Sequence, residues 1–423
     1  MTPFNRRDFL RIGGAAVSLT FLAPRLVLSD AGSNGRILVI LQLVGGNDSV
    51  NTVIPYADPK YRQWRPLLAI PDAEILKVDS RLGLHPSMGA LAELYQRRRF
   101  AFVNNVGFPT LDRSHFHCQD VWQTADENHA GAHGRHSSGW LGRYADLYLG
   151  HEAHSLTALS IGNRVPLGMA AETVIPAAIT SAATYQIQTD PRTPGGREPW
   201  LAAIRGSYEH GSMGHAHGDL DAIRMSGAEM FESIDLLETI PPPSETAGYP
   251  DSSLGRGFQL VSQVLAANLG TRVVWISTGG YDTHSTQGGM HANLLADLSG
   301  SLAAFQADLE QRRLDDRVVV MGWSEFGRRV QENASSGTDH GKAGTMFLMG
   351  NHVKGGAFYG EVPDLGTLDQ GDLPTQIDFR SVYWTLIDDW LGHDPEPVLM
   401  GRYENLGFIG EPDPVARRRA VRR

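Results

Sequence analysis

Acidic and imidazole side chains gather in three short glycine-containing stretches: Gly45 to Asp48, Gly279 to His284 and Thr338 to Gly341. Carboxylates and neutral imidazoles are the ligands that Zn²⁺ and Mn²⁺ take in proteins. Glycine lets the backbone turn sharply beside such groups. If the three stretches meet, the candidate metal ligands are Asp48, Asp282, His284, Asp339 and His340.

Each stretch also has a simpler explanation on its own. Asp48 could cap a helix or a turn, and Asp282 could form an Asx-turn that leaves His284 on the surface. The pair Asp339-His340 alone is a match of only two residues. Their combination favours a site for one or two divalent ions, zinc or manganese.

A candidate nucleophile lies in "TLDRSHFHCQDVWQTA", residues 110–125. Ser114 is predicted at the start of an amphipathic helix, where backbone N–H groups and the helix dipole favour an anion. A metal-activated serine hydroxyl could attack an ester there. The alternative is an ordinary N-cap serine, which stabilises a helix by about 1 kcal/mol.

Polar and cationic side chains near these stretches are candidates for contacting a substrate: Asn47, Arg113, His115, His117, Glu325 and Arg328, with Arg329 and Lys342 as further possibilities. Arginine can bind an anionic oxygen bidentately. Arg113 could equally pair with Asp112, and a solvated face explains Arg328 and Arg329 as well.

Continuous apolar runs of strand length predict the elements that position these residues. The runs are 36–43, 100–106, 156–161, 272–277, 317–321 and 345–349. Helical patterns cover 86–97, 254–269 and 290–309. Strands that alternate with helices predict an α/β fold with a mostly parallel central sheet and helices on both faces.

The candidate residues follow the predicted strands directly, after Val44, Ser277 and Met321. Ligands of open α/β sheets bind beyond the carboxyl ends of the strands. The acid-bearing loops are therefore expected at one edge of the sheet. Asp339-His340 precedes a strand that could bring it to the same edge.

Residues 186–252 differ from the rest and are predicted to form an inserted helical and loop segment, with a helix near 219–237. Its histidines His210, His215 and His217 could bind a metal, but a solvated loop is the simpler interpretation. Residues 411–423 are predicted to be a basic tail.

The chain has 423 residues, a formal net charge of −10 and a single cysteine, Cys118. The negative charge argues against a nucleic-acid-binding protein. Residues 1–30 carry Arg6-Arg7, then Phe9-Leu10 and a short apolar run, which predicts a twin-arginine-type export signal. The expected location is periplasmic or extracellular, the expected partner is the twin-arginine translocation machinery, and no other stretch predicts a membrane span.

The motifs "LVGGNDSVNTVIPY", "RSHFHCQDVWQTA", "GWLGRY", "STGGYDTHSTQ", "SEFGRRVQENASSGTDHG" and "VKGG" resemble the twin-arginine-exported bacterial family called domain of unknown function 1501. That family is placed in the alkaline phosphatase and sulfatase superfamily. The resemblance implies an alkaline phosphatase-like α/β sandwich over residues 31–410 with a two-metal site.

The resemblance also implies roles for single residues. Ser114 resembles the nucleophile, and Asp282 with His284 resembles the first metal's ligands. Asp48, with the pair Asp339-His340, resembles the second metal's ligands.

Two departures from the superfamily pattern concern the first metal. Asp282 and His284 are two residues apart rather than four, which makes His291 a competing ligand. The superfamily's late histidine has only His352 and His393 as candidates. The motif from which sulfatases make formylglycine is absent around Cys118, so that chemistry is not expected.

The sequence therefore predicts an exported metal-dependent hydrolase of a small anionic ester or an anionic polymer, with phosphate favoured over sulfate. One alternative is a non-catalytic binding or surface-associated protein with a degenerate metal site. Another is a metal-free serine hydrolase that uses Ser114 and His284, although Gly-x-Ser-x-Gly is missing.

Overall fold

The computed structural model describes residues 35–128, 138–150, 153–181, 197–209, 219–244 and 246–411. The predicted export signal (1–30) lies outside the described residues. So do the histidines His210, His215 and His217 and all but the first residue of the predicted basic tail.

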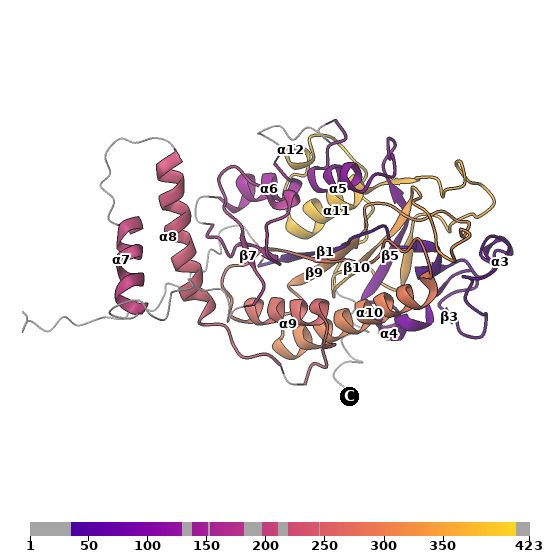
Figure 1. The fold of residues 1–423 in the computed structure, drawn as a ribbon, viewed down its shortest axis with the longest axis horizontal. Coiled ribbons are helices and arrows are strands. Elements are labelled where there is room, and N and C mark those ends of the chain that lie inside the picture. Colours follow the sequence, from indigo (N-terminus) through magenta and orange to yellow (C-terminus); the bar gives the residue numbers. More distant parts are fainter. Residues whose placement is uncertain are drawn as a thin grey trace, which may run out of the picture. The chain divides into compact units, whose positions relative to one another are not determined.

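A nine-stranded sheet forms the centre of the fold (Figure 1). Its strands are β1 (Ile37–Leu43), β5 (Phe100–Gly107), β6 (Ala158–Ile161), β7 (Ala177–Ile179), β8 (Val273–Thr278), β9 (Val318–Trp323), β10 (Gly344–Met349), β11 (Ala357–Tyr359) and β12 (Ile377–Asp378). Their order is β11-β5-β10-β9-β1-β8-β6-β7, with β12 beside β5. Each of the six predicted apolar runs forms one of these strands.

The sheet is mostly parallel, and β10 is the exception. It pairs antiparallel with both β5 and β9, whereas the other pairs in this sheet are parallel. Because β10 runs the opposite way, its first residue lies at the edge where its neighbours end. Residues just before Gly344 therefore reach the same edge as the loops that follow β1, β5, β8 and β9.

Helices cover both faces of the sheet because the buried strands present apolar side chains on both sides. Along β1, Leu38 and Ile40 pack into one apolar cluster, while Val39 and Leu41 pack into the other. The first face is covered by α5 (His115–Thr124), α6 (Trp140–Tyr144), α11 (Phe379–Thr385) and α12 (Glu396–Leu399), and the second by α4 (Gly89–Gln96), α9 (Ser253–Ala266) and α10 (Gln287–Arg312) (Figure 1). The predicted mostly parallel sheet with helices on both faces is confirmed.

The smaller elements lie between these. They are α2 (Ser49–Thr52), α3 (Lys60–Trp64), a three-stranded sheet of β2 (Val53–Ile54), β4 (Gly83–Leu84) and β3 (Leu76–Lys77), 3₁₀ turns at Pro86–Met88 and Leu167–Met169, and π-helical turns at Ala145–Leu149 and Leu386–Leu391. The region predicted as an insertion contains α7 (Arg197–Glu209) and α8 (Asp219–Leu237), which pack together through Tyr208 and Phe231, with ring centroids 6.2 Å apart. Among the described residues, no helix combines the length and apolar character needed to cross a membrane.

Candidate metal centre

Two glycines let the loop after β1 press against its neighbours. Gly45 has φ +125°, and a Cβ there would lie 2.4 Å from the backbone nitrogen of Asp282. Gly46 has φ +78°, and its Cβ would lie 2.3 Å from the ring of Phe326. Any other residue would be strained and would push the loops apart. The two glycines that precede Asn47 are thus required by close backbone approach.

The Arg328 side chain forms hydrogen bonds with three of the loops at this edge. It is fully buried, and its Nε donates to the Gly46 carbonyl at 2.6 Å. Nη1 donates to the Thr338 carbonyl at 2.8 Å, and Nη2 donates to the Tyr281 carbonyl at 3.0 Å and to Asp282 Oδ1 at 2.6 Å. These contacts make Arg328 a positioning residue for the sheet edge. Its predicted contact with a substrate stays a prediction.

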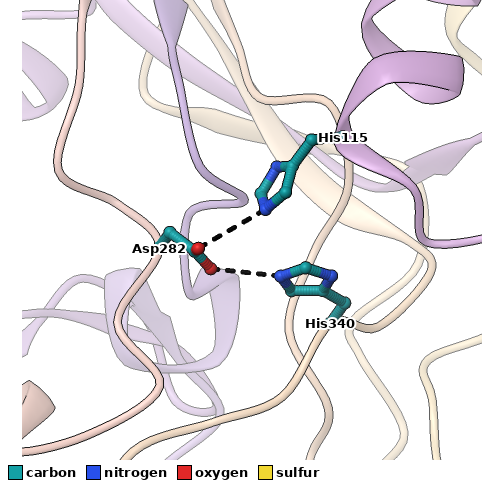
Figure 2. Close-up of side chains that lie close together, drawn as sticks. All are labelled: His115, Asp282 and His340. Atoms are coloured by element: carbon teal, nitrogen blue, oxygen red, sulfur yellow. Dashed lines mark hydrogen bonds and ion pairs between the residues drawn. The ribbon is translucent and has the colours of Figure 1, made fainter.

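Four side chains from three segments converge at this edge: His115 from the start of α5, Asp282 and His284 from the loop after β8, and His340 from the loop before β10 (Figure 2 shows three of them). Asp282 Oδ1 lies 3.0 Å from His284 Nε2 and 3.1 Å from His340 Nε2, and these two nitrogens are 2.9 Å apart. Asp282 Oδ2 lies 3.5 Å from His115 Nε2. One ligand atom each from His115, Asp282 and His340 lies within 4.8 Å of the others. We call His115, Asp282, His284 and His340 the metal centre.

These separations suit one bound ion. Ligands that are roughly 2.0–2.1 Å from a tetrahedral zinc ion are about 3.3 Å from one another. The separations that involve His284 and His340 are near this value before any adjustment of the side chains. His115 was predicted to contact the substrate, and its position gives it a possible ligand role that the sequence did not indicate.

The tautomer of His115 is fixed by Glu325. His115 Nδ1 lies 2.8 Å from Glu325 Oε1, which also accepts from the Gly45 N–H at 2.9 Å and the Gln119 amide at 3.0 Å. A carboxylate only accepts, so Nδ1 carries the proton, and the neutral ring has its lone pair on Nε2. The hydrogen bond with Glu325 also raises the pKa of His115. Burial raises the pKa of Glu325, but the His115 hydrogen bond and its other donors hold that pKa below its usual value.

The other two imidazoles are oriented in the same way. His284 Nδ1 lies 3.3 Å from Asp339 Oδ1, and His340 Nδ1 lies 3.0 Å from the Arg113 carbonyl oxygen. Both partners accept, so a neutral ring whose proton is on Nδ1 presents an unprotonated Nε2 to Asp282. Asp339, which was predicted to be a ligand, is held here as the partner of His284. Its ligand role stays a prediction.

Asp282 supplies a permanent negative charge to the centre. Burial raises its pKa, but the hydrogen bond and the charge of Arg328 lower it to about 2. The carboxylate is therefore ionised throughout the neutral range. Three neutral nitrogen donors and one carboxylate form the kind of ligand set in which zinc is commonly bound.

Asp48 lies in a different environment. It is fully buried, Arg65 Nη1 lies 2.5 Å from its Oδ2, and Arg65 Nη2 lies 2.8 Å from its Oδ1. Val50 N–H donates to Oδ1 at 3.2 Å and Gln287 Nε2 to Oδ2 at 2.5 Å. Burial raises the pKa of Asp48, and the Arg65 charge and hydrogen bond bring it below its usual value. The structure does not group Asp48 with the metal centre, and its role as a second metal's ligand stays a prediction.

The alternative ligand His291 is buried beside Asn47. Its Nε2 lies 2.9 Å from Asn47 Oδ1, and burial lowers its pKa to about 4. Asn47 also donates from Nδ2 to Thr52 Oγ1 at 3.0 Å. Neither residue is in the metal centre, so the ligand role of His291 and the substrate contact of Asn47 stay predictions.

The two late histidines lie elsewhere in the fold. His352 Nδ1 lies 3.1 Å from the Gly410 carbonyl oxygen. Within the described residues, His352 forms no hydrogen bond with a member of the metal centre. His393 Nδ1 lies 3.3 Å from the Tyr144 hydroxyl.

Ser114 is the N-cap of α5, as predicted. Its Oγ accepts the His117 N–H at 3.5 Å, and its own N–H donates to Asp112 Oδ1 at 2.9 Å. His117 Nδ1 lies 3.4 Å from Asp112 Oδ2. Ser114 is half-buried and directly precedes His115, so the nucleophile role and the capping role both remain compatible with its position.

We expect Glu325→Gln to weaken metal binding by about 10- to 100-fold, because outer partners of metal-ligating histidines have effects of this size. Glutamine lacks the charge that holds His115 Nδ1–H. A competition titration against a chromophoric chelator measures the affinity. The matched control is Glu310→Gln, since Glu310 lies on α10 and pairs with Arg97 at the end of α4, so this change should leave the metal affinity unchanged. Equal affinities in both variants would exclude this role for Glu325.

Comparison with protein families gave one match: the model described as "Protein of unknown function (DUF1501)" matches residues 73–400. Among curated proteins no relative was found.

Three similar solved structures give low scores. Phosphonate monoester hydrolase SpPMH from Silicibacter pomeroyi has 9% identity and a TM-score of 0.43 over 90% of this chain and 78% of its own. PsFucS1 sulfatase from Pseudoalteromonas sp. has 8% identity and a TM-score of 0.40 over 90% and 71%. The C-terminal periplasmic domain of EcEptC from Escherichia coli, in complex with Zn, has 9% identity and a TM-score of 0.36 over 75% and 74%. TM-scores below 0.5 describe only a partial correspondence of folds.

Proposed function

We infer that this chain, which belongs to the DUF1501 family of proteins of unknown function, is a metal-dependent hydrolase of an anionic ester. The observation that carries the proposal is the convergence of three imidazole Nε2 atoms on the Asp282 carboxylate, with an acceptor at each Nδ1. When the proton of each ring is on Nδ1, three Nε2 lone pairs face Asp282, and a bound cation would stabilise that arrangement.

The donor set favours zinc. Imidazole suits zinc, whereas Mn²⁺ is better served by carboxylate and water oxygens. A bound divalent ion supplies a Lewis acid and lowers the pKa of a coordinated hydroxyl or water. With one carboxylate among the ligands, the loaded centre would carry a net charge of about +1, which attracts an anionic ester. We propose a single ion here, because Arg65 already neutralises Asp48.

The chain's own groups would then divide the work. Asp282 and the three imidazoles would hold the ion beside the start of α5, where it would attract the anionic ester. Ser114, one residue before His115, provides a hydroxyl at the end of β5 and at a helix N-terminus, where backbone N–H groups favour an anionic oxygen. We propose phosphate esters ahead of sulfate esters as substrates, since the formylglycine motif is missing.

Ser114→Ala should lower kcat by roughly a thousandfold or more on the best ester found in a screen, because the nucleophile is lost. Metal content should not change. The matched control is Ser252→Ala, which removes the N-cap of α9, where Ser252 Oγ accepts the Gly255 N–H at 2.9 Å. Each variant should lose about 1 kcal/mol of helix stability. Unchanged kcat in Ser114→Ala would exclude Ser114 as the nucleophile.

Export by the twin-arginine route is part of the proposal, supported by Arg6-Arg7 and the apolar run that follows. Residues 1–30 fused to a reporter should direct it to the periplasm. Replacing both arginines by lysine should block that export. Periplasmic reporter from the lysine variant would contradict the route.

The alternative of a metal-free serine hydrolase is less well supported. His284 Nε2 lies 2.9 Å from His340 Nε2 and 3.0 Å from Asp282, so its basic nitrogen is already directed at the metal centre. The alternative of a non-catalytic binding protein predicts metal binding without turnover, and the same ester screen separates it from the hydrolase.

A further inference from the structure

Two arginines beside the metal centre share one buried carboxylate. Arg113 donates from Nε to Asp372 Oδ2 at 2.9 Å and also contacts that oxygen through Nη2. Arg329 Nε lies 3.8 Å from the other oxygen, Oδ1, which is too far for a hydrogen bond. The Asp372 side chain is fully buried, and its Oδ1 has no hydrogen-bond partner in the described part of the chain. We call Arg113 and Arg329 the arginine pair.

The backbone of each arginine is tied to the metal centre. The Arg113 carbonyl accepts the His340 Nδ1–H at 3.0 Å, and the Arg329 N–H donates to the Asp339 carbonyl at 2.9 Å. Arg113 has φ +67°, a left-handed conformation that is uncommon for a residue other than glycine and that gathers at functional sites. The arginine pair is therefore fixed next to His340 from two different loops.

The arginine pair keeps unused donors. Over the described ranges, Arg113 Nη1 and both terminal nitrogens of Arg329 have no acceptor on the protein. The side chains are 27% and 39% exposed, so these donors are open to a ligand. Asp372 needs only one guanidinium for charge balance. The second guanidinium leaves an excess of one positive charge.

The neighbouring lysine does not add to this excess. Lys342 Nζ donates to Asp369 at 2.5 Å, which neutralises it. Asp369 and Asp372 exchange backbone hydrogen bonds of 2.9 and 3.0 Å across a tight turn, in which Gly371 has φ +91°. That turn presents the Asp372 carboxylate between the two arginines. Lys342 therefore adds no net charge beside the arginine pair, whereas the Arg329 charge also helps to lower the pKa of the Asp339 carboxylate.

We propose that the arginine pair is an anion-binding subsite that recognises a second oxyanion, such as a sulfate, phosphate or carboxylate group, on the substrate whose ester reaches the metal centre. The substrate class is then a molecule with two anionic groups, and this naming rests on the proposed hydrolase function. Planar guanidinium donors match the oxygens of such groups and bind them with charge-assisted hydrogen bonds.

Sulfate binding measured by isothermal titration calorimetry at low ionic strength tests the subsite, on metal-loaded and on chelator-treated protein. Metal-free wild type should bind sulfate, and Arg329→Gln and Arg113→Lys should each weaken that binding at least about tenfold. The lysine in Arg113→Lys keeps a positive charge beside the buried Asp372 carboxylate, and this should preserve the fold. The matched control is Arg97→Gln, because Arg97 is 40% exposed and pairs with Glu310 on α10.

Equal sulfate affinity in wild type and both arginine-pair variants would overturn the proposal, as would a metal-free wild type that binds no sulfate. The hydrolase proposal fails separately, through absence of bound metal or of turnover. A chain that binds sulfate through the arginine pair but holds no metal keeps the subsite and loses the hydrolase.

The second anionic group has its own readout in the metal-loaded protein. Glucose 1,6-bisphosphate should bind wild type about tenfold more tightly than glucose 6-phosphate, and Arg329→Gln should remove that preference. No preference in wild type would overturn the two-anion substrate class.

Discussion

Asp282→Asn is expected to empty the metal centre and to abolish hydrolysis. The substitution removes the negative charge that faces all three imidazoles while keeping the size of the side chain. Without that charge, a divalent ion would be held by neutral donors beside the buried Arg328 guanidinium, which repels it. The metal content measured by elemental mass spectrometry should fall from about one ion per chain to less than roughly a tenth of an ion, and turnover should be lost in parallel.

The fold should survive this change. Arg328 still donates to the carbonyls of Gly46, Tyr281 and Thr338, so its buried charge keeps three acceptors. Circular dichroism and a denaturation midpoint check this directly. The control is Asp251→Asn, an almost fully exposed carboxylate paired with Arg256, which should retain metal and activity.

Metal removal from wild type provides the reciprocal measurement. A strong chelator should remove activity, and added zinc should restore it in wild type but not in Asp282→Asn. Full activity in chelated protein would contradict the metal-dependent function. Metal retained in Asp282→Asn would show that the convergent imidazoles bind without the carboxylate or that the ion lies elsewhere.

The strands and the edge that carries the centre could be predicted from sequence because they depend on local patterns. A strand that is buried on both faces is apolar at nearly every position, so runs such as 36–43 and 317–321 indicate β1 and β9 directly. Residues after such runs then fall at one edge. In the structure Asp282, His284 and His340 lie close together at that edge, and their roles as ligands stay a prediction.

The ligand assignment within that edge was harder to predict. His115 and His117 occupy the first and third positions of α5, and sequence spacing does not tell which imidazole turns toward Asp282. The structure separates them: His117 stacks on Phe108, with ring centroids 6.4 Å apart, while His115 reaches the centre. Glu325 was predicted near the substrate, whereas its role as the partner of His115 depends on a contact across 210 residues.

The charge partner of Arg113 could not be predicted from sequence spacing either. Its neighbour Asp112 was the natural partner by sequence, but Asp112 accepts from the Ser114 N–H and faces His117. Arg113 instead reaches Asp372, 259 residues away. A charge partner that is distant in sequence leaves no local signal. The sequence indicated Arg113 and Arg329 as candidates, but it could not show that they share Asp372.

Arg65→Met is expected to lower the free energy of unfolding by about 3–5 kcal/mol, because it leaves Asp48 buried without its partner. Both side chains of this ion pair are fully buried. Arg65 also donates to the Val330 carbonyl at 2.9 Å and to the Arg329 carbonyl at 3.1 Å, so those acceptors lose a donor as well. Chemical denaturation should show a lower midpoint with an unchanged slope.

A matched control lies three residues away. Arg62 forms a surface ion pair with Asp72, with both side chains well exposed, and Arg62→Met should cost no more than about 1 kcal/mol. The double variant Arg65→Met with Asp48→Asn should be more stable than Arg65→Met alone, since the buried charge is removed. A single variant as stable as wild type would mean that the pair contributes nothing to the fold.

The same variant decides what Asp48 is for. If Asp48 only anchors the loop after β1, Arg65→Met should bind the same single ion as wild type and merely unfold more easily. If Asp48 is a metal ligand that Arg65 masks, removing the guanidinium frees both Asp48 oxygens and the carbonyls of Val330 and Arg329 from its contacts. Elemental mass spectrometry should then find a second ion per chain. We expect one ion, because Asp48 is grouped with Gln287 and Val50 rather than with Asp282. Two ions would instead show that Arg65 occupies the place of a second metal.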